Sequence, residues 1–448
     1  MKKLFFAVFM LLLVLSAGQS RLARADAVTD WNANAGKAAL AACISPADDP
    51  FHESRMYAMM HIAIHDALNA IDRRSRPYVF DKKARARASV DAAVAGAARD
   101  VLVQLLNDLP FPPACIANGV ASIDADYIAA LGAIADGPKK TEGLKIGQRA
   151  AKAILDLRAA DGSDTPLQDF SYPQGTNPGE WRFTPDFPPP VPPAFALAPG
   201  WGNVTPFVLR DSAQFRPDPP YALTSKKYAA DFNEIKSLGG DDVTTPSART
   251  EEQTEIGFFW IESSPLAWNR IARTVSAAKS LDAWENARLF GLLNMALADG
   301  YIGSWETKYH YNFWRPITAI RTADTDGNPD TEGDPTWTPL QWTYPIPDYD
   351  SGHSVEGGAA AEVLKRFFGT DHIRFRACSL SLPMVEEQCG GASEVLRRYK
   401  SFSQAAEENG ESRILIGIHF RKAVEEGIEH GRKIGARAVN RFLEPVKK

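Results

Sequence analysis

Three stretches in the C-terminal half of the sequence carry residue types that bind an oxyanion. The first, "WETKYHYNFWRPITAIR" from Trp305, holds Lys308 and Arg315 seven residues apart. On one helix they would share a face two turns apart and could close on a single anion. The alternative is a solvated basic face, but the surrounding residues are aromatic and indicate burial, and buried cations need an anionic partner.

The second stretch, "PDYDSGHSVEGGAAAEVLKRFFG" from Pro347, places a small polar cluster at the start of an alanine-rich helix. Ser351 occupies the N-cap position, Gly352 lets a ligand approach the backbone, and His353 lies in the first turn. Unpaired N–H groups at a helix N-terminus bind oxyanions, and a histidine beside the anion can exchange a proton with it. Taken alone, the stretch is better explained as an ordinary capped helix with a surface histidine.

The third stretch, "ESRILIGIHFRKAVEEG" from Glu411, contains Arg413 and, after an apolar run, His419. A histidine in an apolar helix is more often a core residue than a catalyst, but a guanidinium close by in sequence favours a grip on phosphate-like oxygens. Together the three stretches supply a lysine, two arginines, a serine, a glycine N–H and two histidines. That is a complete set for a tetrahedral oxyanion.

These residues resemble the signature of the superfamily shared by vanadium-dependent haloperoxidases and type 2 phosphatidic acid phosphatases. The signature has three elements: K-x6-R-P, P-S-G-H and S-R-x5-H-x3-D. They are matched in turn by Lys308, Arg315 and Pro316, by Ser351, Gly352 and His353, and by Ser412, Arg413 and His419. Over nearly the whole chain after residue 25, the sequence resembles soluble, secreted bacterial haloperoxidase homologues.

The sequence departs from that signature at two positions. Asp350 replaces the proline of the second element and adds negative charge beside the anion-binding serine. Ala423 replaces the aspartate that would orient the imidazole of His419 one helical turn away. A carboxylate elsewhere must then substitute, with Glu426 and Glu411 as weak candidates, or the histidine is less activated. A degenerate anion-binding homologue is therefore one alternative.

The resemblance implies vanadate as cofactor and two possible chemistries. In a haloperoxidase, hydrogen peroxide oxidises a halide, and the oxidised halogen then reacts with a small organic substrate; Trp305 matches an aromatic residue near the halide. In a soluble acid phosphatase, phosphate esters occupy the same site, His419 attacks phosphorus and His353 protonates the leaving alcohol. The missing aspartate should impair a phosphatase more, which favours the haloperoxidase.

The resemblance also assigns a role to each matched residue. His419 is the axial ligand to vanadium, His353 is the acid–base group that handles peroxide protons, and Lys308 polarises the bound peroxide. The residues implied to hold the equatorial oxygens of vanadate are Lys308, Arg315, Ser351, Gly352 and Arg413.

The elements that must position these residues are predicted to be helices. Apolar residues recur at helical spacing, and neither hairpins nor alternating strands and helices are apparent. We therefore expect an all-α fold, a large helical bundle of the vanadium haloperoxidase type, with residues 26–448 forming one domain or two intimately packed ones and the site motifs within 305–423. The predicted helices cover 54–72, 88–107, 119–134, 142–159, 225–238, 249–262, 267–306, 352–368, 391–408 and 411–441.

A proline-rich segment interrupts the helical pattern. Eight prolines lie between residues 173 and 193 and exclude a regular helix or a central strand. A partner-recognition motif is one interpretation, but a long loop wrapped over the fold is favoured. Trp181 and Trp201 indicate that this loop is pinned to the core.

The N-terminus has the features of a secretory signal: Lys2 and Lys3, an apolar run, and an Ala-x-Ala site before Asp26. An uncleaved membrane anchor is the alternative, but the run is short for a bilayer. No later segment is expected to span a membrane. The chain carries a net charge of −5, and loss of the four basic residues of the signal leaves −9. We expect a secreted or periplasmic protein, possible oligomerisation, and no nucleic-acid or membrane partner.

Three smaller signals complete the prediction. Of the three pairings that four cysteines allow, Cys378 with Cys389 and Cys43 with Cys115 are favoured in an oxidising compartment. His61 and His65 are spaced like metal ligands, but core packing explains them better. The segment 324–334 has oxygen ligands for calcium, yet its glycine lies at the wrong place for an EF-hand, so a turn-rich loop is expected.

Overall fold

The computed structural model describes residues 26–45, 49–84, 87–184, 195–382, 389–390 and 394–446. The predicted signal, residues 1–25, and most prolines of the proline-rich segment lie outside the described residues. Within them the chain is helical, as predicted, with two small antiparallel strand pairs: β1 (Gln168–Asp169) with β2 (Ala196–Leu197), and β3 (Phe375–Cys378) with β4 (Leu396–Tyr399).

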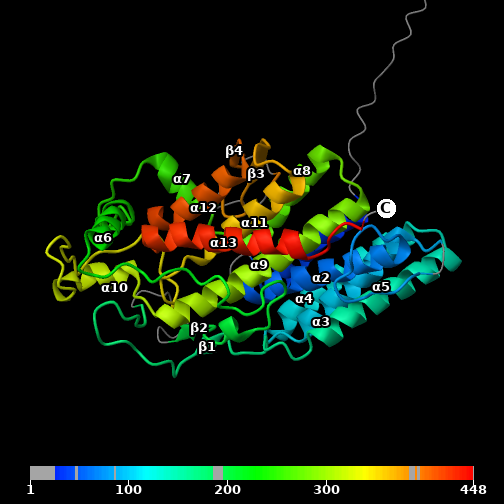
Figure 1. Cartoon of the computed structure of the whole chain (residues 1–448), viewed down its shortest axis with the longest axis horizontal. Coiled ribbons are helices and arrows are strands. Elements are labelled where there is room, and N and C mark those ends of the chain that lie inside the picture. Colours follow the sequence, from blue (N-terminus) through cyan, green and yellow to red (C-terminus); the bar gives the residue numbers. More distant parts are fainter. Residues whose placement is uncertain are drawn as a thin grey trace, which may run out of the picture.

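The helices fall into an N-terminal and a C-terminal group that meet along α9 (Figure 1). The first group is α1 (Ala27–Ala41), α2 (Pro50–Ile71), α3 (Val90–Asn107), α4 (Pro113–Gly132) and α5 (Pro138–Leu157). The second is α6 (Lys226–Leu238), α7 (Glu251–Phe259), α8 (Ser264–Lys279), α9 (Ala283–Tyr311), α10 (Pro316–Arg321), α11 (Gly352–Phe368), α12 (Phe402–Leu415) and α13 (Arg421–Arg441). Short 3-10 turns cover Trp201–Asn203 and Ala323–Thr325.

The helix α9 is the element on which the two groups are packed. It contacts α2 on one side and α11 and α13 on the other, and its residues from Leu289 to Trp305 are buried without interruption. A helix that is apolar all round must be covered by neighbours on every side. One continuous hydrophobic cluster accordingly runs from Val28 to Leu443.

The structure corrects several predicted boundaries. The first helix, α1, was not predicted; Asp26 and Thr29 form a capping box at its start. The expected helix 267–306 is two helices, because Ser280 adopts a left-handed conformation and Asp282 caps α9. The expected helix 391–408 gives way to strand β4, and α12 starts only after the N-cap Ser401.

The helix α4 contradicts the expectation that no segment after the N-terminus could span a membrane. By length and composition alone, this helix is long and apolar enough to cross a membrane. Only Gly119 and Ile123 are buried within it, while it packs against α1 and α3.

His61, His65 and the loop 324–334, which were expected to have structural roles, make hydrogen bonds within the fold. His61 Nε2 lies 2.8 Å from Asn32 Nδ2, and His65 Nδ1 lies 2.9 Å from a carboxylate oxygen of Asp66. In the predicted turn-rich loop, the Asp326 carboxylate accepts hydrogen bonds from residues of the same loop. Among the described residues no group of three or more histidine, cysteine, aspartate or glutamate side chains could hold a metal ion.

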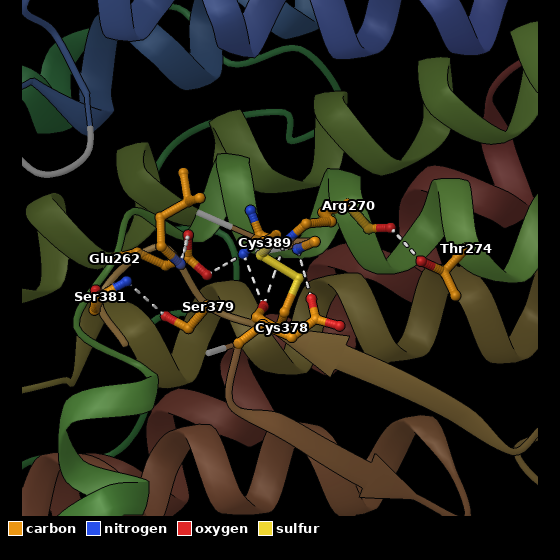
Figure 2. The surroundings of a disulfide bond; sticks show 10 residues. Glu262, Arg270, Thr274, Cys378, Ser379, Ser381 and Cys389 are labelled. Atoms are coloured by element: carbon orange, nitrogen blue, oxygen red, sulfur yellow. Dashed lines mark hydrogen bonds and ion pairs between the residues drawn. A yellow bond between two sulfur atoms is a disulfide. The ribbon is translucent and has the colours of Figure 1, made fainter. Parts of the chain in front are cut away.

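Both favoured cysteine pairings are confirmed. The Cys43–Cys115 bond ties the end of α1 to the start of α4 across a sequence separation of 72 residues. The Cys378–Cys389 bond follows β3 and spans 11 residues. In Figure 2 this second bond lies beside Arg270 of α8, which donates hydrogen bonds to the Cys378 carbonyl oxygen.

The two bonds should differ in their contribution to stability. A cross-link stabilises a protein mainly by restricting the unfolded chain, and the effect grows with loop length. We expect the variant C43S/C115S to lose about 4 kcal/mol of unfolding free energy and C378S/C389S about 3 kcal/mol. Denaturant unfolding under oxidising conditions measures both, and equal or reversed losses would contradict the loop-length argument.

Candidate active site

A sharp turn after α9, rather than one continuous helix, brings Lys308 and Arg315 together. The helix ends at Tyr311, Asn312 takes a left-handed conformation (φ 49°), and Arg315 becomes the N-cap of α10. The backbone N–H of Trp181 donates to the Asn312 carbonyl at 2.8 Å. The prediction that both cations share a helical face was therefore wrong, although their proximity was correctly anticipated.

The ammonium group of Lys308 is fully buried and holds the loop that precedes α11. Its Nζ atom donates to the carbonyl oxygens of Pro347 (3.2 Å), Asp348 (3.0 Å) and Asp350. Burial lowers the pKa of Lys308 to about 7, and the neighbouring Arg315 acts in the same direction. Because its three N–H groups donate to three carbonyl oxygens, Lys308 fixes the loop and acts on the anion site through its charge.

The two guanidinium groups are held by neutral partners. Arg315 donates through Nε to the Ile346 carbonyl (2.7 Å) and through Nη1 to the Ile418 carbonyl (2.7 Å). Arg413 donates through Nε to its neighbour Ser412 and through Nη2 to the Trp260 carbonyl (2.6 Å). Burial lowers the pKa of both to about 10, so both stay charged at neutral pH. Within the described residues, one terminal nitrogen of each has no partner.

The N-terminus of α11 supplies further donors. Ser351 is its N-cap, as predicted, but makes no capping hydrogen bond through its side chain. The first helical N–H groups, from Gly352 onward, have no acceptor within the helix. A Cβ atom at Gly352 would lie 3.2 Å from the ring of Trp305, so the tight packing against Trp305 favours glycine here. The predicted anion-binding end of the helix is present.

His353 lies in the first turn of α11, and its Nε2 atom is buried without a hydrogen-bond partner in the structure. Burial and the nearby Arg413 push the pKa of His353 well below its usual value, although the carbonyl oxygens of Glu262 and Ile261 favour the charged ring. Glu262 is held by Arg270, next to the disulfide in Figure 2. His353 is therefore a neutral imidazole with an unengaged nitrogen.

His419 lies in a loop and not, as predicted, inside a helix. The chain leaves α12 at Leu415, turns at Gly417 (φ 83°), and enters α13 only at Arg421. Asp348 places a carboxylate oxygen 2.9 Å from His419 Nδ1. A proton on Nδ1 makes Nε2 an acceptor, and Arg315 Nη1 donates to it at 3.1 Å.

Asp348 is thus the carboxylate that the sequence signature appeared to lack. Neither proposed substitute serves, because Glu426 pairs with Lys422 and Glu411 pairs with Arg421. Burial raises the pKa of Asp348 to about 7, whereas burial keeps that of His419 well below its usual value. Asp348 was visible in the second stretch, but nothing in its spacing indicated that it would reach a histidine 71 residues away.

The unusual Asp350 does not face the anion-binding groups. One of its carboxylate oxygens accepts a hydrogen bond from Ser304 (2.7 Å), and the other lies 2.7 Å from His430 Nδ1. Only its backbone carbonyl approaches the site, where Lys308 binds it. The expected repulsion beside Ser351 is therefore relieved by the direction of the side chain.

These groups border one cavity of about 230 Å³. Its polar wall contains Lys308, Arg315, Gly352, His353, Arg413 and His419, and its apolar wall contains Phe51, Phe195, Leu197, Trp305 and Tyr344. Open guanidinium nitrogens, a helix N-terminus and an unengaged imidazole nitrogen all suit a tetrahedral oxyanion. The structure brings six of the seven predicted site residues to this cavity; the seventh, Ser351, is the N-cap beside it and is not among the lining residues, and its hydroxyl accepts a hydrogen bond from Ser354 (2.9 Å).

Comparison with known proteins finds similarity to vanadium haloperoxidases. Residues 288–448 match the family described as the VCPO second helical-bundle domain. The chain is 26% identical to the vanadium chloroperoxidase of Curvularia inaequalis over 475 residues, covering 84% of this chain and 75% of the relative. It also superposes on crystal structures of a bacterial vanadium-dependent iodoperoxidase (TM-score 0.75, 23% identity, 94% and 97% of the two chains) and of a holo-type bacterial vanadium-dependent chloroperoxidase (0.65, 17%, 87% and 91%).

The chain has the vanadium haloperoxidase fold. The resemblance inferred from the three stretches and the expected helical-bundle architecture are therefore both confirmed. The matched segment begins within α9 and contains all three stretches, whereas the N-terminal helices are aligned only in the whole-chain comparisons. The division of this vanadium haloperoxidase fold into one or two domains stays a prediction.

The Asp348–His419 contact can be tested by anion binding. Removing a carboxylate that orients a ligand histidine typically weakens metal affinity 10- to 100-fold. We expect Asp348→Asn to weaken orthovanadate binding by about that factor in isothermal titration calorimetry. Glu426→Gln is the matched control and should bind as the wild type does; the reverse ranking would restore Glu426 as the partner.

Proposed function

We propose that the protein is a vanadium-dependent haloperoxidase that uses hydrogen peroxide to oxidise a halide. The observation that carries the proposal is the convergence of Arg315, Arg413 and the α11 N-terminus on a cavity that also contains the unengaged nitrogen of His353. The relatives named above, a chloroperoxidase and an iodoperoxidase, support the reaction class.

Vanadate fits the donor set. The terminal nitrogens of Arg315 and Arg413, the Ser351 hydroxyl and the Gly352 N–H would hold its oxygens, with Lys308 supplying charge. His419 Nε2 would coordinate the vanadium. Bound vanadate supplies the transfer of oxygen from peroxide to halide, which no amino-acid side chain performs.

The surrounding residues would prepare the site for that chemistry. Because its pKa is lowered, His419 is neutral at pH 7, and Asp348 fixes the tautomer that puts the lone pair on Nε2. That lone pair accepts from Arg315 Nη1 in the structure and would exchange this hydrogen bond for coordination. His353 is also neutral and has a free nitrogen, so it can take a proton from peroxide. The aromatic wall excludes water and admits small substrates.

The contact between Asp348 and His419 makes phosphatase activity a second candidate function. The lack of an aspartate at position 423 does not count against this reaction, because Asp348 places a carboxylate oxygen 2.9 Å from His419 Nδ1 and can orient the ring. With His419 so oriented, nucleophilic attack on phosphorus is chemically feasible. Similarity to a vanadium chloroperoxidase and a vanadium-dependent iodoperoxidase favours the haloperoxidase. Hydrolysis of a chromogenic phosphate ester by the vanadate-free protein tests the alternative.

We further propose that residues 1–25 direct export, so that the protein works outside the cytoplasm. Two disulfides and no free cysteine among the described residues support this proposal, since such bonds persist in oxidising compartments. N-terminal sequencing of protein recovered from the culture medium or periplasm would test it, with Asp26 as the expected first residue.

The haloperoxidase proposal predicts vanadate-dependent activity. Purified protein incubated with orthovanadate should halogenate a phenol when peroxide and chloride, bromide or iodide are added. Protein treated with a chelator and assayed without vanadate is the control. Failure with all three halides after confirmed vanadate binding would overturn the proposal.

Two histidine variants should separate binding from proton transfer. His419→Ala removes the coordinating nitrogen, and we expect it to abolish both vanadate binding and halogenation. His353→Ala should lower kcat by about 10²- to 10⁴-fold, as loss of a general base does, while vanadate affinity changes little. His65→Gln, in a buried network that does not line the cavity, is the histidine control. Equal loss of vanadate affinity in both site variants would contradict the assigned roles.

A further inference from the structure

The connection between α7 and α8, residues 260–263, forms part of the wall of the anion cavity. Ile261 and Ser263 line the cavity, and the carbonyl oxygen of Trp260 accepts a hydrogen bond from Arg413 Nη2 at 2.6 Å. Together with the contact of Nε to the neighbouring serine, this bond fixes the plane of the Arg413 guanidinium. The nitrogen that Arg413 offers to an anion therefore points in a direction set partly by this connection.

Glu262 anchors the connection to the strand β3. Its side chain is buried, forms an ion pair with Arg270 of α8, and accepts a hydrogen bond from the backbone N–H of Leu380 at 3.3 Å. Arg270 also donates to the Cys378 carbonyl oxygen, at 3.0 Å from Nη2 and 3.3 Å from Nε. Figure 2 shows Glu262 and Arg270 beside the disulfide. The cavity wall is thus linked to the end of β3 by direct contacts.

A second glutamate links the same connection to the strand β4. The indole Nε1 atom of Trp260 donates to a carboxylate oxygen of Glu408 at 3.1 Å. Glu408 lies on α12 and accepts further hydrogen bonds from two residues of β4, Tyr399 at 2.6 Å and Arg397 at 2.7 and 2.9 Å. A guanidinium that grips both oxygens of a carboxylate fixes its direction as well as adding energy. Trp260 is therefore held through its indole by β4.

The two strands form one small unit that the second disulfide fixes in place. They pair antiparallel over four residues, and α8 packs against β3. A two-stranded pair alone is only marginally stable. The bond from Cys378 to Cys389 closes the stretch of sequence that contains Leu380. It therefore constrains both backbone groups that bind the Glu262–Arg270 pair, the Cys378 carbonyl and the Leu380 N–H.

We propose that the β3–β4 pair, fixed by the Cys378–Cys389 bond, positions Arg413 for the anion through Glu262 and Glu408. Neither glutamate lines the cavity, so both act on the anion only through the connection 260–263. They are positioning residues and do not touch the reacting atoms. The inference rests on the proposed function, since it takes vanadate as the anion that Arg413 holds.

The variants Glu262→Gln and Glu408→Gln each remove one support and keep the size of the side chain. An amide presents its NH2 group to a donor from which the carboxylate accepted a hydrogen bond, so the contact is broken. We expect each variant to weaken orthovanadate binding about tenfold in isothermal titration calorimetry, as altered partners of ligand residues do. Glu411→Gln, on the same helix as Glu408 and paired with Arg421, is the matched control and should bind as the wild type does.

A double-mutant cycle distinguishes positioning from a general loss of structure. If Glu262 acts through Arg413, then Glu262→Gln should weaken vanadate binding in the wild type and cause no further loss in Arg413→Ala. The same holds for Glu408→Gln. Losses that add in full would show that the glutamates do not act through Arg413 and would overturn the proposal.

The two disulfides separate positioning from stability. We expect C378S/C389S to weaken vanadate binding about tenfold. C43S/C115S, for which the larger loss of unfolding free energy is expected, should leave the affinity unchanged. Both are measured at a temperature at which circular dichroism shows them folded. Equal weakening in the two variants would indicate an effect of stability alone and would overturn the role of the Cys378–Cys389 bond.

Binding and turnover together distinguish this inference from the proposed function. Wild-type vanadate affinity in both glutamate variants would overturn the positioning role and leave the haloperoxidase proposal intact. A wild type that binds vanadate without halogenating would overturn the proposed function, while the affinities of the variants would still decide the support of Arg413. A wild type that binds neither vanadate nor inorganic phosphate would overturn both.

Discussion

The structure depends on three buried basic side chains that form no salt bridge with a carboxylate in the part of the chain that the structure describes. Lys308, Arg315 and Arg413 are held by backbone carbonyls and a serine hydroxyl, which satisfy hydrogen bonds but do not neutralise charge. Burying such charges without compensation is costly. A bound oxyanion supplies the missing charge, so the arrangement is best understood as a site whose folding already favours an anion.

Burial, together with the same cations, keeps both histidines neutral. The charges of Arg413 and Lys308 lower the pKa of His353, and those of Arg315, Lys308 and Arg413 lower that of His419, in each case after the larger effect of burial. One group of charges therefore attracts the anion and also keeps two imidazoles neutral. A neutral imidazole can coordinate a metal or accept a proton, which a charged one cannot.

The sequence predicted the helical class and the charged and histidine residues that line the polar wall of the cavity, because motif spacing and helical periodicity are local properties. It failed where the backbone leaves a helix. The turn at Asn312 and the loop around Gly417 depend on left-handed conformations that interrupt an otherwise continuous apolar pattern. Asp348 escaped prediction for another reason: its contact with His419 joins segments whose relative position is fixed only by packing.

The departure at position 350 shows how a changed motif residue can be accommodated. A carboxylate that faced the anion would oppose binding, but Ser304 of α9 and His430 of α13 draw that of Asp350 the other way. Gly303 makes room for this arrangement, since a Cβ atom there would lie 3.1 Å from the His430 ring. The aspartate thus ties α9, the anion-site loop and α13 together. Replacement of a motif proline by an acid is in this fold a structural link and not a sign of a lost site.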